Sequence, residues 1–231
     1  MCPEDAGSRV AAPRRFRVRS SGAPVTLSLV VVSTLIWLLQ IMPGSTVTDQ
    51  LAFVPLGTLI EPWRLLTSAF VHDPSSPLHL LLNMYSVYIF GRILEPMLGR
   101  SRFLALYLIS AIGGSLAVLI LSPLNSWVVG ASTSCFGLMA AYFVIARKLG
   151  ASSGQLVGLI AINLAFGFFV SGISWQGHLG GLIAGGAISY IYVQTMKPNQ
   201  RTLQVILTAV LTGVILVLAA AVAFLRLYFL G

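Results

Sequence analysis

The run LQVILTAVLTGVILVLAAAVAFL occupies residues 203–225 and contains no charged side chain. As an α-helix it would extend about 34 Å, enough to cross the hydrocarbon core of a bilayer. Six further long apolar runs precede it, at 25–42, 78–98, 103–121, 127–146, 155–170 and 175–194. None shows the alternation of apolar and polar residues that membrane strands require. The sequence therefore predicts an all-α membrane protein with seven transmembrane helices.

The composition indicates the same class. Hydrophobic residues make up 57% of the chain and charged residues 9%, whereas an ordinary soluble domain is about 25% charged. This excludes a water-soluble fold, and the apolar content excludes a disordered chain. The net charge of +8 comes from basic clusters between the apolar runs, a pattern that orients membrane proteins, so no nucleic-acid partner is expected.

The basic residues predict which side of the membrane each loop occupies. With a cytoplasmic N-terminus, 12 of the 14 Lys and Arg residues fall on the cytoplasmic side and only Arg64 and Arg226 fall outside. That distribution satisfies the positive-inside rule. The inside set comprises Arg9, Arg14, Arg15, Arg17, Arg19, Arg92, Arg100, Arg102, Arg147, Lys148, Lys197 and Arg201.

The chain divides into three parts. Residues 1–22 are expected to form a basic, disordered cytoplasmic tail, residues 23–200 a six-helix core, and residues 201–231 an additional C-terminal transmembrane helix. The longest connection, 43–77, mixes Gly, Pro and Thr with short apolar pieces, which predicts a structured external loop lying in the membrane interface. The two cysteines cannot form a disulfide framework, and nothing indicates a metal or an organic cofactor.

Four polar side chains lie within the apolar runs, where an unsatisfied polar group is costly. His79 and Asn83 open the second helix, Ser132 opens the fourth and His178 opens the sixth. These helices all run from outside to inside in the predicted orientation, so the four groups share one depth below the external surface. Small residues at 131, 134 and 137 are expected to face the Gly181-xxx-Gly185 pair, a composition that allows close helix packing. Such packing would bring Ser132 within hydrogen-bond reach of His178.

This set of groups has the chemistry of acyl transfer. A serine hydroxyl becomes a nucleophile when a neutral imidazole removes its proton. Glu95 lies near the opposite end of the second helix and Asp73 lies in the loop, so the arrangement would be a Ser-His dyad without a carboxylate. His79, Asn83 and the backbone N–H of Ser132 are suitable donors for the oxyanion of a tetrahedral intermediate.

At these residues the chain resembles the rhomboid intramembrane serine proteases, over about residues 61–190. The resemblance implies a rhomboid-like bundle of six core helices, with the seventh as an addition and the fifth as a lateral gate for substrate. It also implies an endopeptidase that cleaves transmembrane substrates near their external ends through an acyl-enzyme. The motifs, in order, are EPWR at 61–64 with FVH at 70–72, HLLLN at 79–83 with Gly91, Glu95 and Gly99, GAS at 130–132, and GH at 177–178 with Gly181 and Gly185.

The same resemblance implies roles for single residues. Ser132 would be the nucleophile, His178 the general base and acid, and His79 and Asn83 the oxyanion donors, while Phe136 would pack on the catalytic imidazole. Trp63 and Arg64 would belong to a structural element of the first loop.

One position departs from the family pattern. Thr133 stands where rhomboids usually have glycine, and its side chain could crowd the substrate cleft or shift the helix start. Thr133 and Ser134 are themselves alternative nucleophiles, although neither occupies the family's position.

Taken singly, each motif also has a simpler interpretation. A serine in a membrane helix commonly bonds to its own helix, and a lone histidine commonly serves helix packing. On that basis His79 and Asn83 would cap a helix, Trp63 and Arg64 would anchor the interface, and His72 would be a loop residue without chemistry.

Two other functions compete with proteolysis. The departure at Thr133 favours a catalytically inactive rhomboid-like protein that binds transmembrane helices for quality control or trafficking. A transporter or channel would need a polar path across the bilayer, and apart from Asn163 and a few hydroxyls the inner halves of helices four to six offer none. The short connections and the lack of a targeting presequence favour a prokaryotic plasma membrane.

Overall fold

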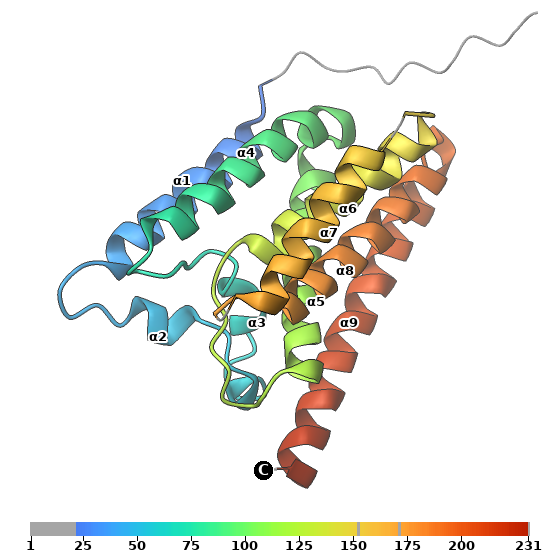
Figure 1. The fold of residues 1–231 in the computed structure, drawn as a ribbon. Coiled ribbons are helices and arrows are strands. Elements are labelled where there is room, and N and C mark those ends of the chain that lie inside the picture. The colour runs from blue at the N-terminus through green and yellow to red at the C-terminus, as the bar shows by residue number, and fades with distance from the viewer. Residues whose placement is uncertain (1–21, 152, 171, 231) are drawn as a thin grey trace, which may run out of the picture.

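The computed structural model describes residues 22–151, 153–170 and 172–230, and this part of the chain is helical with no β-strand. The predicted tail, 1–22, lies outside the described residues except for Gly22. Figure 1 shows the long helices packed side by side, with α9 along one flank and the pair α1 and α4 on the other. The long helices are α1 (Pro24–Gln40), α4 (Pro77–Leu98), α5 (Arg100–Leu121), α6 (Ser132–Lys148), α7 (Gly154–Phe169), α8 (Trp175–Gln194) and α9 (Arg201–Leu230).

The predicted helix limits hold to within three residues except at the end of α9, which runs to Leu230 rather than Leu225, and at the start of α6. The apolar run begins at Trp127, but the helix begins at Ser132. Val128 instead pairs with Phe53 as an isolated antiparallel bridge, and Gly130 has a φ of +118°. Hydrophobicity alone does not reveal this difference, because the extended segment 127–130 is as apolar as the helix that follows it.

The segment 43–77 is structured, as expected. It contains the short helices α2 (Val47–Leu51), η1 (Pro55–Gly57) and α3 (Arg64–Thr67). The Arg64 side chain bonds the carbonyl oxygen of Ala52 at 3.1 Å and forms an ion pair with Glu61 at 2.8 Å. Because these contacts join the two halves of the loop, Arg64 fixes its shape, whereas Trp63 is 52% exposed on the surface.

A buried carboxylate joins α1 to α4. Glu95 accepts hydrogen bonds from the backbone N–H groups of Val25 and Thr26 at 3.0 and 2.8 Å, and from the Thr26 hydroxyl at 2.7 Å. The first N–H groups of a helix lack intrahelical partners, so the carboxylate caps α1. Gly91 lies one turn earlier on α4, and a Cβ there would overlap Thr26.

The centre of the bundle consists of α5, α6 and α8, packed backbone to backbone. A Cβ at Gly181 would overlap the Thr133 carbonyl group, and one at Gly185 would overlap Gly137. The face of α6 toward α8 therefore carries positions 133 and 137. The predicted face of 131, 134 and 137 was wrong at Ser134, whose hydroxyl points at α5 and donates to the Tyr107 carbonyl oxygen at 2.9 Å.

Replacing Gly181 by alanine is expected to lower the stability of the folded protein by about 1–3 kcal/mol, the usual cost of overpacking. The added methyl group cannot fit unless α6 and α8 separate. Gly186→Ala on the same helix is the matched control, because its nearest neighbour would be the Ala140 Cβ at 3.8 Å. Thermal unfolding in detergent measures both variants, and equal midpoints would contradict close packing at Gly181.

The C-terminal helix is fastened to α5. One guanidinium nitrogen of Arg226 donates to the carbonyl oxygens of Leu119 and Ser122 at 2.6 and 2.8 Å, which are otherwise unpaired groups at a helix end. In the described part of the chain, two helical segments have the length and hydropathy of a membrane span, Arg100–Leu121 and Pro198–Phe229. Pro24–Gln40 and Gly154–Phe169 are apolar but shorter.

Candidate active site

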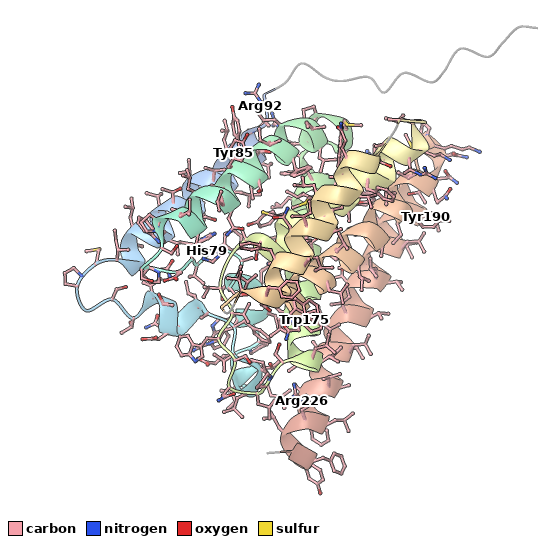
Figure 2. The ribbon with its side chains drawn as sticks, viewed as in Figure 1. His79, Tyr85, Arg92, Trp175, Tyr190 and Arg226 are labelled. Atoms are coloured by element: carbon pink, nitrogen blue, oxygen red, sulfur yellow. The ribbon has the colours of Figure 1, made fainter. Side chains whose placement is uncertain are left out.

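A cavity of about 380 Å³ lies where α4, α6 and α8 begin. The structure places all four polar residues predicted to share one depth, His79, Asn83, Ser132 and His178, in its lining. Figure 2 shows His79 and Trp175, three residues before His178, well away from Arg92 at the other end of the bundle. The cavity reaches the surface, because Trp127 also lines it and is 58% exposed.

The serine and the histidine are direct neighbours. Ser132 is the first residue of α6 and His178 lies in the first turn of α8, and the Ser132 Oγ is 3.0 Å from the His178 Nε2. The Phe136 ring stacks on the imidazole at a centroid distance of 4.3 Å and an interplanar angle of 17°. That stacking limits rotation of the ring, so the Nε2 atom stays directed at the hydroxyl.

The other nitrogen of the imidazole has no partner among the described residues. The His178 Nδ1 is buried and makes no hydrogen bond to them. If the Nε2 accepts the serine proton, the proton of the neutral ring must sit on the Nδ1. No described carboxylate reaches that atom, so the described residues offer no third member that would extend the pair to a triad.

His79 presents a donor to the same cavity. Its Nδ1 accepts a hydrogen bond from the backbone N–H of Asp73 at 3.4 Å, and a neutral ring that accepts at one nitrogen carries its proton on the other. The His79 Nε2 is therefore a donor. Asn83 gives one amide hydrogen to the His79 carbonyl oxygen at 2.9 Å, which leaves the second hydrogen of that NH2 group for the cavity.

Gly130 keeps the space in front of these donors open. A Cβ at this position would lie 2.8 Å from the His79 Nε2 and 3.7 Å from the Asn83 Nδ2. Its φ of +118° is also one that other residues rarely adopt. Both sterics and backbone conformation therefore require glycine two residues before Ser132.

His72 has a structural role that the sequence did not reveal. The prediction of a loop residue without chemistry was incomplete, since the side chain is fully buried and its Nε2 accepts the backbone N–H of Ala131 at 3.4 Å. Burial, and secondly the nearby His79, lower the pKa of His72 to about 3. The ring is therefore neutral near pH 7 and able to accept this bond, which holds the residue before Ser132 in place.

Thr133 points away from the cavity. Its side chain lies between α5 and α8, where a Cβ at Gly114 would lie 2.6 Å from the Thr133 Cβ and one at Gly177 would lie 3.0 Å from its methyl carbon. The threonine thus fills a notch left by two glycines. The Ser134 hydroxyl is bonded to the Tyr107 carbonyl oxygen. Neither Thr133 nor Ser134 lines the cavity, so neither is placed as an alternative nucleophile.

Thr133→Gly is accordingly expected to lower stability by about 1–2 kcal/mol, from lost burial and helix propensity. If the chain cleaves substrates as the resemblance implies, the rate per folded molecule should change little, because the Thr133 side chain does not line the cavity. Thermal unfolding and a cleavage assay measure the two quantities, and Thr212→Gly on α9 controls for a glycine within a helix. A gain in rate with unchanged stability would show instead that Thr133 crowds the cleft.

Comparisons with known proteins identify the family of this chain. The Rhomboid domain profile matches residues 60–195. YdcA of Bacillus subtilis, whose name proposes a rhomboid protease, is 32% identical over 74% of this chain and 89% of its own length. The rhomboid protease GluP of Bacillus subtilis is 41% identical over 64% of this chain but 31% of its own length.

A third relative comes from a plant. The mitochondrial RHOMBOID-like protein 6 of Arabidopsis thaliana is 35% identical over 68% of this chain and 52% of its own length. The profile match covers more than half of the chain and contains Trp63, Arg64 and every residue that lines the cavity except Thr48. The chain therefore belongs to the rhomboid family of multi-pass membrane proteins, which includes intramembrane proteases.

Proposed function

We propose that this protein is an intramembrane serine endopeptidase that cleaves transmembrane segments of membrane-protein substrates through an acyl-enzyme. The observation that carries the proposal is the 3.0 Å distance between the Ser132 Oγ and the His178 Nε2. This distance lies within the range required of a nucleophile and its base. The pair lines a cavity that also contains two side-chain donors.

In the proposed reaction, the His178 Nε2 takes the hydroxyl proton while the Ser132 Oγ attacks the substrate carbonyl carbon. The negative charge that develops on the carbonyl oxygen is stabilised by donors from His79, Asn83 and the backbone N–H of Ser132. That N–H belongs to the first turn of α6 and is free of an intrahelical partner. The imidazolium then protonates the leaving amine, and water releases the acyl group by the same steps.

Substrate access requires both water and an opening toward the lipid. The exposed edge of the cavity at Trp127 supplies the first. For the second, α7 is the proposed gate, because its side chains are mostly exposed and only Leu156 and Gly167 are buried. Substrates should carry small or helix-breaking residues near the cut, since a peptide bond inside a helix does not present its carbonyl group to the serine.

The proposed topology has the N-terminus in the cytoplasm and the cavity toward the external side of a prokaryotic plasma membrane, so cleavage falls near the external end of the substrate helix. The charge distribution of the loops supports this orientation. No cofactor enters the proposed mechanism, and the proposed partners are transmembrane protein substrates and the lipid bilayer.

A fluorophosphonate probe that reacts with activated serines tests the proposal in native membranes. Wild-type protein should be labelled, and labelling should be lost in both Ser132→Ala and His178→Ala. Ser134→Ala, whose hydroxyl bonds to Tyr107, should still be labelled. Failure to label the folded wild type would favour the alternative, a rhomboid-like protein that binds transmembrane helices without cutting them. The position of Thr133 between α5 and α8 removes the steric reason for that alternative.

A further inference from the structure

A second polar cavity, of about 480 Å³, lies between α5, α8 and α9. Tyr192 in its lining is 14 residues after His178 on the same helix, a separation of about 21 Å along the helix axis. The cavity is therefore near the opposite end of the bundle from the dyad. Figure 2 labels two residues of α8 near these sites, Trp175 close to the dyad and Tyr190 close to the second cavity, and shows them well apart along the bundle.

Two cations without a carboxylate partner line this cavity. Among the described residues the single ion pair is Arg64 with Glu61, so Arg102 and Arg201 have no acidic group within 4.0 Å. The Arg102 side chain donates a hydrogen bond to the Leu98 carbonyl oxygen, and this bond is long at 3.5 Å. Ser101 and Thr208 add hydroxyl groups to the lining. This combination of guanidinium and hydroxyl groups suits a phosphate ester.

An apolar cavity of about 270 Å³ lies farther along the same three helices. That second cavity is also formed by α5, α8 and α9, and its lining includes Ala117, Ala187 and Leu211. From Gln204 in the polar cavity to Leu211 in the apolar one, α9 rises about 10 Å. We name the two cavities together the α5/α8/α9 seam. It has a cationic, hydroxyl-lined end and an apolar end, arranged along the membrane-spanning helices.

We propose that the seam binds one anionic phospholipid. Its phosphodiester lies between Arg102 and Arg201, and one acyl chain occupies the apolar cavity. Basic pockets between transmembrane helices commonly hold anionic lipid headgroups, and the apolar cavity distinguishes a lipid from free phosphate. A zwitterionic lipid carries a cation in its own headgroup. That cation competes with Arg102 and Arg201 for the lipid phosphate. The proposal depends on membrane embedding but not on proteolytic activity.

The test uses full-length protein purified in a neutral detergent and stripped of lipid. Native mass spectrometry counts bound lipid during titration with phosphatidylglycerol, and separately with phosphatidylcholine of the same acyl chains. Inorganic phosphate is the third arm. The wild type should bind one phosphatidylglycerol, at least about tenfold more tightly than phosphatidylcholine, and inorganic phosphate should not compete at equal concentration.

The variants separate the two ends of the seam. Arg102→Gln combined with Arg201→Gln should weaken phosphatidylglycerol binding by about tenfold or more, while Arg147→Gln, an exposed arginine outside the seam, should leave it unchanged. Ala187→Leu fills the apolar cavity and should weaken binding, unlike Ala220→Leu on the exposed face of α9. If the double variant does not fold, Arg201→Glu at the exposed start of α9 replaces it.

Equal affinity for the two lipids would overturn the proposal. So would undiminished phosphatidylglycerol binding by the folded arginine variant, or inorganic phosphate competing as strongly as the lipid.

Discussion

Ser132→Ala is expected to reduce the rate of substrate cleavage by at least about 10⁴-fold, the scale of losses seen when a serine nucleophile is removed. The Ser132 Oγ is the described hydroxyl that bonds the His178 Nε2. Its loss leaves the cavity and its donors in place but removes the atom that would form the acyl-enzyme. The measurement is cleavage of a reporter transmembrane segment by purified protein in liposomes.

The non-additivity of the dyad sharpens this experiment. His178→Ala should be nearly as inactive as Ser132→Ala, and the double variant no worse than either, because base and nucleophile act in one step. Ser134→Ala is the matched control, since that serine lies two residues away on α6 and its hydroxyl bonds to Tyr107. Unfolding midpoints near that of the wild type establish that the variants are folded. A Ser132→Ala protein that still cleaves would remove this residue from the mechanism.

The lengths and spacing of the apolar runs were sufficient to predict the number and order of the long helices. Each long apolar run contains one long helix, because a run near 20 residues admits few other structures in lipid. The common depth of His79, Ser132 and His178 followed from the alternating direction of those helices. The contact between Ser132 and His178 was predicted from the glycines of α8, and Gly181 and Gly185 do lie against the α6 backbone.

The sequence did not predict which side chains of α6 face which neighbouring helix, because this depends on the rotation of the helix about its axis. Small residues at several positions of α6 could each face α8, and only packing decides that Thr133 and Gly137 do so while Ser134 faces α5. The position of Thr133 changes its interpretation from a cleft residue to a packing residue. Likewise, the start of α6 at Ser132 depends on the Val128 bridge to Phe53, a contact between segments 75 residues apart in the chain.

His72 illustrates a further limit. Its role depends on a single hydrogen bond to Ala131, a residue 59 positions later, and loop histidines carry no pattern that predicts such a partner. The Phe70-Val71-His72 motif marked the position without indicating its contact. The lining of the α5/α8/α9 seam was equally hidden, because Arg102 and Arg201 belong to basic clusters whose evident role is to orient the protein.

The second large effect is expected at Asn83. Asn83→Ala should lower kcat by about 10²–10³-fold with little change in KM, because the oxyanion that its amide would stabilise exists only along the reaction path. The amide bonds the His79 carbonyl oxygen at 2.9 Å and lies close to the space kept open by Gly130. If the Asn83 amide instead bonded the substrate in its ground state, loss of the amide would raise KM. Steady-state kinetics with the reporter substrate separates the two cases.

The chain contains a closely matched control for this experiment. Asn163 on α7 also donates its amide to the carbonyl oxygen four residues earlier, Leu159, at 2.8 Å, but its side chain is exposed and lies outside the cavity. Asn163→Ala therefore loses the same kind of local helix bond without touching the site, and its kcat should stay near that of the wild type. Asn83→Asp keeps the shape of the side chain but replaces the donor with an acceptor, so it should be at least as slow as Asn83→Ala. An unchanged kcat in folded Asn83→Ala would exclude the amide as an oxyanion donor and leave His79 and the Ser132 N–H to stabilise the intermediate.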